Sequence, residues 1–149
     1  YDMDKLVTKG VTKKSVALTS DHLNGALADF KKVLLEKDEA TELFGQERGA
    51  GNIDGILGNV MQSFGGAEVY PTVEEKAAHL LYFMVKNHPF VDGNKRSGAY
   101  AFIWFLNRAK ILDKSKMSPA ALTALTLFVA ESDPKQKDKM TKLILQLLK

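Results

Sequence analysis

The sequence predicts an all-α fold, and three observations support that prediction. Apolar residues recur at spacings of three and four, the period of an amphipathic helix, and no segment keeps a period of two. Cap residues and helix breakers divide the chain into helix-sized segments. The chain has 149 residues, of which 45% are hydrophobic and only 4 are Pro, which is typical of one domain with a single core.

The first predicted helix starts after Ser20, the expected N-cap, and stops by Gly45. Its apolar face consists of Leu23, Leu27, Phe30 and Leu34. The preceding residues, 1–17, are Lys-rich and show no period, so we expect them to be a linker or the end of an upstream region.

A second helix is predicted to open at the cap residue Asn52. Its apolar face comprises Ile53, Ile56, Leu57, Val60, Met61 and Phe64. Gly65 and Gly66 end this helix. The extended stretch that follows, 67–71, is too brief to form a strand pair by itself.

Two more helices flank a polar loop. Thr72 and Glu75 form a capping box that opens a helix running to Lys86. The next helix starts near Asn94, runs through Leu106 and is apolar almost all round, so we predict that it is the buried central helix.

The last two predicted helices span 118–131 and 135–148, and the first of them has Ser118 as N-cap before a proline. The net charge of +3 arises within residues 132–149, where five Lys stand against two Asp. We interpret these lysines as a solvated helix face. The chain lacks the basic stripe with interleaved aromatic residues that is typical of nucleic-acid binding.

The composition excludes further classes of protein. The chain has no cysteine, which rules out a disulfide scaffold, a thiolate metal site and cysteine catalysis. The absence of cysteine also fits a reducing compartment, so we expect a cytoplasmic protein. No apolar run approaches the roughly 20 residues that span a bilayer, so no membrane partner is expected.

One segment, 88–98, combines residue types that handle phosphate. It is a polar loop that runs into the start of the most apolar helix, and a helix N-terminus presents unpaired backbone N–H groups and a positive dipole end. Asn94, Lys95 and Arg96 stand on that end, which makes it a ready anion site. Gly93 lets the backbone approach a ligand closely.

Two further side chains complete this set. Asp92 offers a hard oxygen ligand suited to a Mg²⁺ ion that bridges phosphates, and His88 can take a proton from a hydroxyl near neutral pH. Each residue also has an ordinary interpretation, as a turn residue, a helix-end cap or a surface charge. An anion site, a metal ligand and a base within nine residues favour phosphate-group transfer. The other histidines, His22 and His79, are interpreted as helix-end caps.

The residues His88–Arg96, HPFVDGNKR, resemble the signature of the Fic/Doc family. The Fic branch reads HPFx(D/E)GNGR, and the death-on-curing (Doc) branch reads HxFx(D/E)ANKR. The longer stretch 51–106 also resembles the Doc-like core. The resemblance implies an all-α bundle of about six to eight helices with a short β-hairpin flap. It also implies that residues 18–149 form the catalytic domain.

The resemblance further implies roles for individual residues. His88 would deprotonate the target hydroxyl, and Asp92 would hold Mg²⁺. The catalytic set would be His88, Asp92 and Arg96, and the phosphates of ATP would be bound by Gly93, Asn94, Lys95 and Arg96. Phe90 would be the buried anchor of the motif. A target segment would dock by strand pairing on the flap, which would contain Gly65, Gly66, Glu68, Val69 and Tyr70.

The differences between this chain and the two signatures decide which reaction we expect first and which is the alternative. Lys95 stands where the Fic branch has glycine, and Ala99 stands where it has a second arginine. Both departures favour the Doc branch, which transfers the γ-phosphate of ATP. Pro89 and Gly93 are Fic-like, so nucleotidyl transfer, chiefly AMPylation, is the alternative. A non-catalytic interaction module on the same scaffold is the second alternative.

The expected partner is a protein with a reactive hydroxyl group. The Doc resemblance also implies a target in the translation machinery and restraint by a separately encoded antitoxin. The Lys-rich residues 1–17 indicate instead an upstream domain that regulates the activity. Nucleic acid is not an expected partner.

Overall fold

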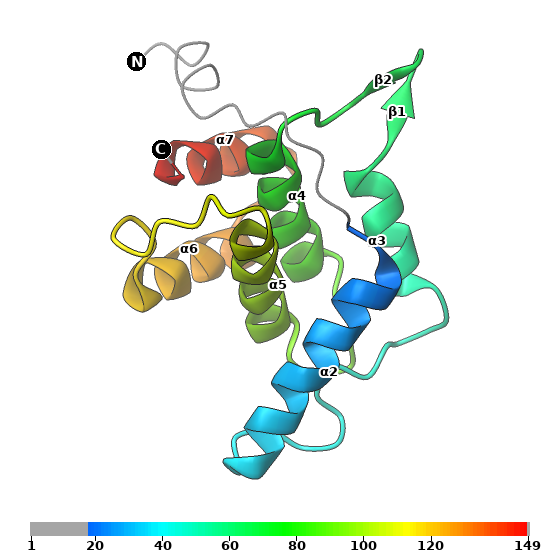
Figure 1. Ribbon diagram of the computed structural model, residues 1–149, viewed down its shortest axis with the longest axis vertical. Helices are drawn as coiled ribbons and strands as arrows, with labels where there is room; N and C mark the ends of the chain where they lie inside the picture. The colour runs from blue at the N-terminus through cyan, green and yellow to red at the C-terminus, as the bar shows by residue number, and fades with distance from the viewer. Residues whose placement is uncertain (1–17, 149) are drawn as a thin grey trace.

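The computed structural model describes residues 18–148, so the linker predicted for residues 1–17 lies outside the described residues. Within 18–148 the prediction of an all-α fold is confirmed: six α-helices are joined to one small antiparallel hairpin (Figure 1). The elements are α2 (Ser20–Glu36), α3 (Asn52–Val60), β1 (Ser63–Phe64), β2 (Ala67–Glu68), α4 (Val73–Lys86), α5 (Asn94–Arg108), α6 (Pro119–Glu131), the 3₁₀ turn η1 (Pro134–Gln136) and α7 (Lys137–Leu147).

Helix α4 is the central helix of the bundle. Twelve of its fourteen residues are buried, because α3, α5, α6 and α7 all pack against it (Figure 1). The prediction that the helix starting near Asn94 is central is therefore wrong. That helix, α5, buries six of its fifteen residues, and Ile103 and Trp104 are only half-buried.

The first helix is shorter than predicted. Its N-cap is Thr19, whose hydroxyl accepts a hydrogen bond from the His22 backbone N–H at 3.2 Å, so the predicted cap Ser20 is the first helical residue instead. The helix ends at Glu36 and not near Gly45. Asp38 follows with a φ of 56°, a left-handed conformation that aspartate tolerates better than most residues and that closes the helix.

The second helix also ends earlier than predicted, at Val60. Phe64, assigned above to its apolar face, lies in β1 with 85% of its surface exposed. Gly65 and Gly66 have φ values of 62° and 84°, so they form a two-residue turn that pairs β1 with β2. The hairpin that the family resemblance implied is therefore present, although the apolar pattern alone predicted no strand pair.

The predicted helix caps at Thr72 and Ser118 are confirmed. The Thr72 hydroxyl accepts a hydrogen bond from the Glu75 backbone N–H at 3.0 Å, and the Ser118 hydroxyl accepts one from Ala121 at 3.1 Å. The last helix, α7, begins two residues later than predicted, after the 3₁₀ turn. No helix within residues 18–148 combines the length and the apolar character needed to cross a bilayer.

Candidate functional site

The motif loop, residues 87–93, joins the end of α4 to the start of α5. In Figure 1 it lies at the end of these two helices away from the hairpin. A cavity of about 440 Å³, here called the motif cavity, opens at this loop. Its walls are formed by Arg48, His88, Val91, Asp92, Gly93, Asn94, Lys95 and Arg96. All the motif residues for which the sequence predicted a chemical role therefore line one cavity, together with Arg48, which the sequence analysis did not single out.

The motif loop is held in place by a bracing segment, residues 44–48, that lies between α2 and α3. Three backbone hydrogen bonds join the two segments. Gly45 donates to the Asp92 carbonyl at 3.0 Å, Val91 donates to the Gln46 carbonyl at 2.8 Å, and Arg48 donates to the Pro89 carbonyl at 2.9 Å. The loop therefore presents its side chains from a backbone with fixed geometry.

Gly93 and Phe44 fit together tightly. Gly93 has a φ of 85°, which disfavours any residue with a Cβ. A Cβ at this position would also lie 2.3 Å from two atoms of the Phe44 ring, which is 1% exposed. The ring therefore occupies the space that a side chain at position 93 would need.

The side chain of Asn94 clamps the motif loop. Its Oδ1 accepts a hydrogen bond from the Phe90 backbone N–H at 2.9 Å, and its Nδ2 donates to the Phe90 carbonyl at 3.0 Å. Arg48 donates from Nε to the same carbonyl, also at 3.0 Å. The Phe90 side chain is buried, at 2% exposure, so residue 90 is fixed by both its backbone and its ring.

His88 lies at the boundary between the motif cavity and a second cavity. It is exposed and has a φ of 49°, a conformation that non-glycine residues rarely adopt and that is enriched at functional sites. Among residues 18–148 the structure contains no hydrogen bond to its imidazole ring, so its nitrogen atoms face no competing partner there. The second cavity, of about 470 Å³, follows α3 and is lined by Arg48, Gly51, Asn52, Gly55, Ile56, Asn59, Asn87, His88 and Pro89.

Two basic residues stand at the start of α5, beside the motif cavity. Lys95 is exposed, whereas the Arg96 guanidinium donates to the Glu39 carbonyl at 2.7 Å and lies 4.6 Å from the centre of the Phe44 ring. No side chain caps the N-terminus of α5, so its first backbone N–H groups have no side-chain acceptor, and Gly93, Asn94, Lys95 and Arg96 at this helix start line the cavity. A positive helix end with two basic side chains has the charge that suits an anion.

Asp92 is exposed beside this end and supplies one carboxylate. No group of three or more His, Cys, Asp or Glu side chains within residues 18–148 could hold a metal ion. The donor set at Asp92 fits Mg²⁺, since that ion is commonly bound by one or two carboxylates plus the phosphates of a nucleotide. It does not fit a metal ion that needs a ligand shell made entirely of protein groups.

The hairpin extends away from the helical body, at the end of α3 opposite the motif loop (Figure 1). The residues from Gly65 to Val69 are exposed. Its base is tied to α4 by the buried Lys76, whose Nζ lies 2.6 Å from Glu68 Oε2 and donates to the Tyr70 carbonyl. None of these residues lines the motif cavity.

His79 supports the base of the hairpin from inside α4. Its ring stacks on Tyr70 with the ring centres 3.5 Å apart, and its Nδ1 lies 2.7 Å from the Glu75 carbonyl oxygen, to which it donates. Burial lowers the pKa of His79 below its ordinary value, and the nearby Lys137 acts in the same direction. His79 lies inside α4 and not at either end of it, so it is not the helix-end cap expected from the sequence; its contacts instead support the hairpin.

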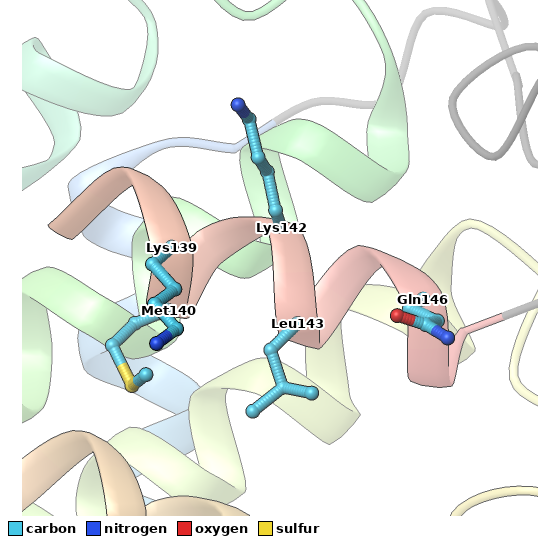
Figure 2. A pocket seen from close by; sticks show the side chains of 5 residues that line it. All are labelled: Lys139, Met140, Lys142, Leu143 and Gln146. Atoms are coloured by element: carbon cyan, nitrogen blue, oxygen red, sulfur yellow. The ribbon is translucent and has the colours of Figure 1, made fainter. Parts of the chain in front are cut away.

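A third cavity, of about 420 Å³, lies along α7. Its described lining residues are Lys139, Met140, Lys142, Leu143 and Gln146. Figure 2 shows Met140 and Leu143 on one side of the helix and Lys142 extending to the other. The described residues of this wall include no acid and no histidine, so they offer no carboxylate or imidazole for phosphate chemistry.

The chain is similar in sequence to known proteins across the segment that carries the motif loop. The toxin Doc of Mycolicibacterium smegmatis is 39% identical to the chain over 57 residues, a match that covers 38% of this chain and 43% of that protein. No solved structure matches significantly. The sequence profile described as Fic/DOC family matches residues 18–106, which include α2, the hairpin, the bracing segment, the motif loop and most of α5. Because this match covers more than half of the chain, the protein belongs to the Fic/DOC family.

Proposed function

We propose that this protein transfers a phosphate-containing part of ATP to a hydroxyl side chain of another protein, and that the transferred part is the γ-phosphate. Membership of the Fic/DOC family implies a protein-modifying transferase and is consistent with ATP as substrate. The observation that carries the proposal is the motif cavity, where a base, one carboxylate and an anion-binding helix end meet. Lys95, which follows the Doc signature, and Ala99, which departs from the Fic branch, favour the γ-phosphate.

The proposed reaction uses His88 as general base. Its imidazole accepts the proton of the target hydroxyl, and the hydroxyl oxygen forms a bond to the γ-phosphorus. The bond from that phosphorus to the β–γ bridging oxygen breaks, and ADP leaves. The backbone N–H groups at the start of α5, with Lys95 and Arg96, bind the phosphates and hold them in line with the hydroxyl.

Asp92 would hold Mg²⁺, which, when bound, neutralises phosphate charge. Asn94 contributes by keeping the motif loop in shape, since both polar atoms of its side chain bind the Phe90 backbone. The hairpin, Gly65–Tyr70, would pair with an extended segment of the target, and its exposed edge supports this role.

AMPylation is the alternative reaction, and the Fic-like residues Pro89 and Gly93 support it. The experiment that separates the two uses wild-type and His88→Ala protein with lysate, Mg²⁺ and ATP labelled on either the α- or the γ-phosphate. We expect His88-dependent label on protein from γ-labelled ATP alone. Label from α-labelled ATP would establish AMPylation. Absence of label from both, with no binding of ATP, would favour a non-catalytic interaction module.

The similarity to the toxin Doc supports a proposal about biological role. We infer that the chain acts as a growth-inhibiting toxin, that its target belongs to the translation machinery, and that an antitoxin or a domain upstream of residue 18 restrains it. Expression of wild-type protein is then expected to arrest growth, and expression of the His88→Ala variant is not. Equal growth with both proteins would contradict this role.

A further inference from the structure

Arg48 lines the candidate site and has no role in the reaction proposed above. Arg48 and His88 are the two residues that line both the motif cavity and the cavity along α3. The motif cavity contains the basic residues at the start of α5, whereas the cavity along α3 presents amide side chains and glycine backbone. The first is suited to phosphates and the second to a polypeptide segment.

The arrangement of the two cavities indicates where the phosphorus under attack would lie. The phosphates enter from the motif cavity, and the accepting hydroxyl must reach His88, which stands where the two cavities meet. The phosphorus under attack therefore lies at this boundary. Arg48 is the cation that shares the boundary with His88.

The geometry of Arg48 suits a contact with phosphate. Its backbone N–H binds the Pro89 carbonyl, and its Nε binds the Phe90 carbonyl, so the guanidinium is oriented from two points. Within residues 18–148 its terminal nitrogens make no hydrogen bond, whereas Arg96 already binds the Glu39 carbonyl and the Phe44 ring. An arginine held in this way presents two donors to an anion with little loss of side-chain freedom.

We propose that Arg48 is a catalytic residue that binds the phosphate being transferred. This inference rests on the proposed function. As the bond from the hydroxyl oxygen to phosphorus forms and the bond to the leaving group breaks, charge spreads over the non-bridging oxygens, and Arg48 stabilises that charge while remaining protonated. The proton of the hydroxyl goes to His88.

The test measures nucleotide binding, which needs no target protein. ATP, ADP and AMP are titrated, each with Mg²⁺, into wild type, Arg48→Met and Arg48→Lys by calorimetry. We expect Arg48→Met to weaken ATP binding about tenfold and to leave ADP binding unchanged. Arg48→Lys should recover part of the loss, because it restores charge without the planar fork. Lys114→Met, which removes an exposed cation far along the chain, is the matched control and should change nothing.

The outcomes separate this inference from the function on which it rests. Equal ATP binding by wild type and Arg48→Met would overturn the role of Arg48 and leave the transferase proposal standing. Weaker binding of all three nucleotides by Arg48→Met, recovered in part by Arg48→Lys, would place the α-phosphate at Arg48. That result would support the inference and assign AMPylation. A wild-type protein that binds none of the three would contradict the proposed function itself.

Transfer rates give a second measurement that a purely structural role would not reproduce. Arg48→Met should lower kcat for protein labelling by about 10²–10³-fold, with a smaller change in the KM for the target protein. The thermal midpoints of the variants are recorded alongside, because Arg48→Met also removes the hydrogen bond to Phe90. A loss of kcat that only followed a loss of folded protein would contradict a direct contact with phosphate.

Discussion

The motif loop and the hairpin are both short irregular connections between helices, yet they are held in very different ways. The motif loop is joined to residues 44–48 by three backbone hydrogen bonds, is clamped by Asn94, and is anchored by the buried ring of Phe90. The hairpin has exposed strands, and Lys76 of α4 ties it to the helical body near its base. The difference fits the proposed function: the groups proposed to bind phosphate are held by the fold in advance, whereas the hairpin proposed to meet a target protein is exposed.

The largest expected effect on stability comes from replacing a glycine in each of the two regions. Gly93 and Gly66 have nearly the same φ, 85° and 84°, but a Cβ on Gly93 would collide with the Phe44 ring, whereas a Cβ on Gly66 would meet nothing within 4 Å. We expect Gly66→Ala to cost about 1 kcal/mol of unfolding free energy from backbone strain alone. Gly93→Ala should cost about 3 kcal/mol or more, since overpacking adds to the strain.

Urea denaturation of the two variants and of wild type measures this difference. Equal losses for Gly93→Ala and Gly66→Ala would show that the Phe44 ring moves aside without cost, and the motif loop would then be less rigid than inferred. Position 93 also distinguishes the signatures of the two branches of the family. The Doc branch has alanine at this position, and in this chain the ring of Phe44 takes the space that such an alanine would need.

Local signals in the sequence predicted the helices and six of the residues that line the motif cavity, namely His88, Asp92, Gly93, Asn94, Lys95 and Arg96. The caps at Thr72 and Ser118 act within one turn of helix, so short sequence patterns were sufficient to place them. The burial of α4 could not be predicted this way, because it depends on four neighbouring helices. Phe64 was misassigned for a related reason: the Gly65–Gly66 turn places it in a strand, although its spacing also fits the apolar face of α3.

The bracing segment had no signal in the sequence. Phe44 and Gly93 are distant along the chain, and neither the packing of one on the other nor the pairing of Gly45 with Asp92 follows from a local pattern. Arg48 was missed for the same reason, since an arginine in a loop is ordinarily a surface charge. Its position between two cavities exists only in the folded chain.

A second prediction concerns the tie at the base of the hairpin. Lys76→Met removes the ammonium group that binds Glu68 and the Tyr70 carbonyl, and we expect a loss of about 1–2 kcal/mol of unfolding free energy. Amide hydrogens of the hairpin should exchange faster, while those of the motif loop should be unaffected. The matched control is Lys86→Met, whose ammonium binds the carbonyls of Ala130 and Ser132, so its effect should appear at the end of α6.

Hydrogen exchange that accelerated equally in the hairpin and the motif loop of Lys76→Met would contradict the division between the two regions. Unchanged exchange in the hairpin would show that Lys76 does not hold it. In both cases the free energy of unfolding gives an independent check on whether the whole fold has weakened.

A third, smaller effect depends on pH. The pKa of His79 lies below its ordinary value of 6.5 because the ring is buried, so the folded state binds fewer protons than the unfolded chain as the pH falls below that value. The stabilising contribution of neutral His79 is therefore present above pH 6.5 and is lost as the pH falls towards the lowered pKa. Denaturation at a series of pH values should show a slope in this range that His79→Phe flattens. A slope that persisted unchanged would mean that another group is responsible, and His22→Gln, at an exposed histidine, is the control.

The smallest expected effect on the fold is that of Phe64→Ser. This variant also tests most directly whether the hairpin and the motif loop act independently. Phe64 is 85% exposed on β1, so its loss should change the free energy of unfolding by less than about 0.5 kcal/mol. A large exposed aromatic side chain on a free strand is instead suited to contact with a docked protein segment. We therefore expect ATP binding to be unchanged and the KM for the protein target to rise. An unchanged KM would remove Phe64 from target docking, whereas weaker ATP binding would mean that the hairpin and the motif loop are coupled after all.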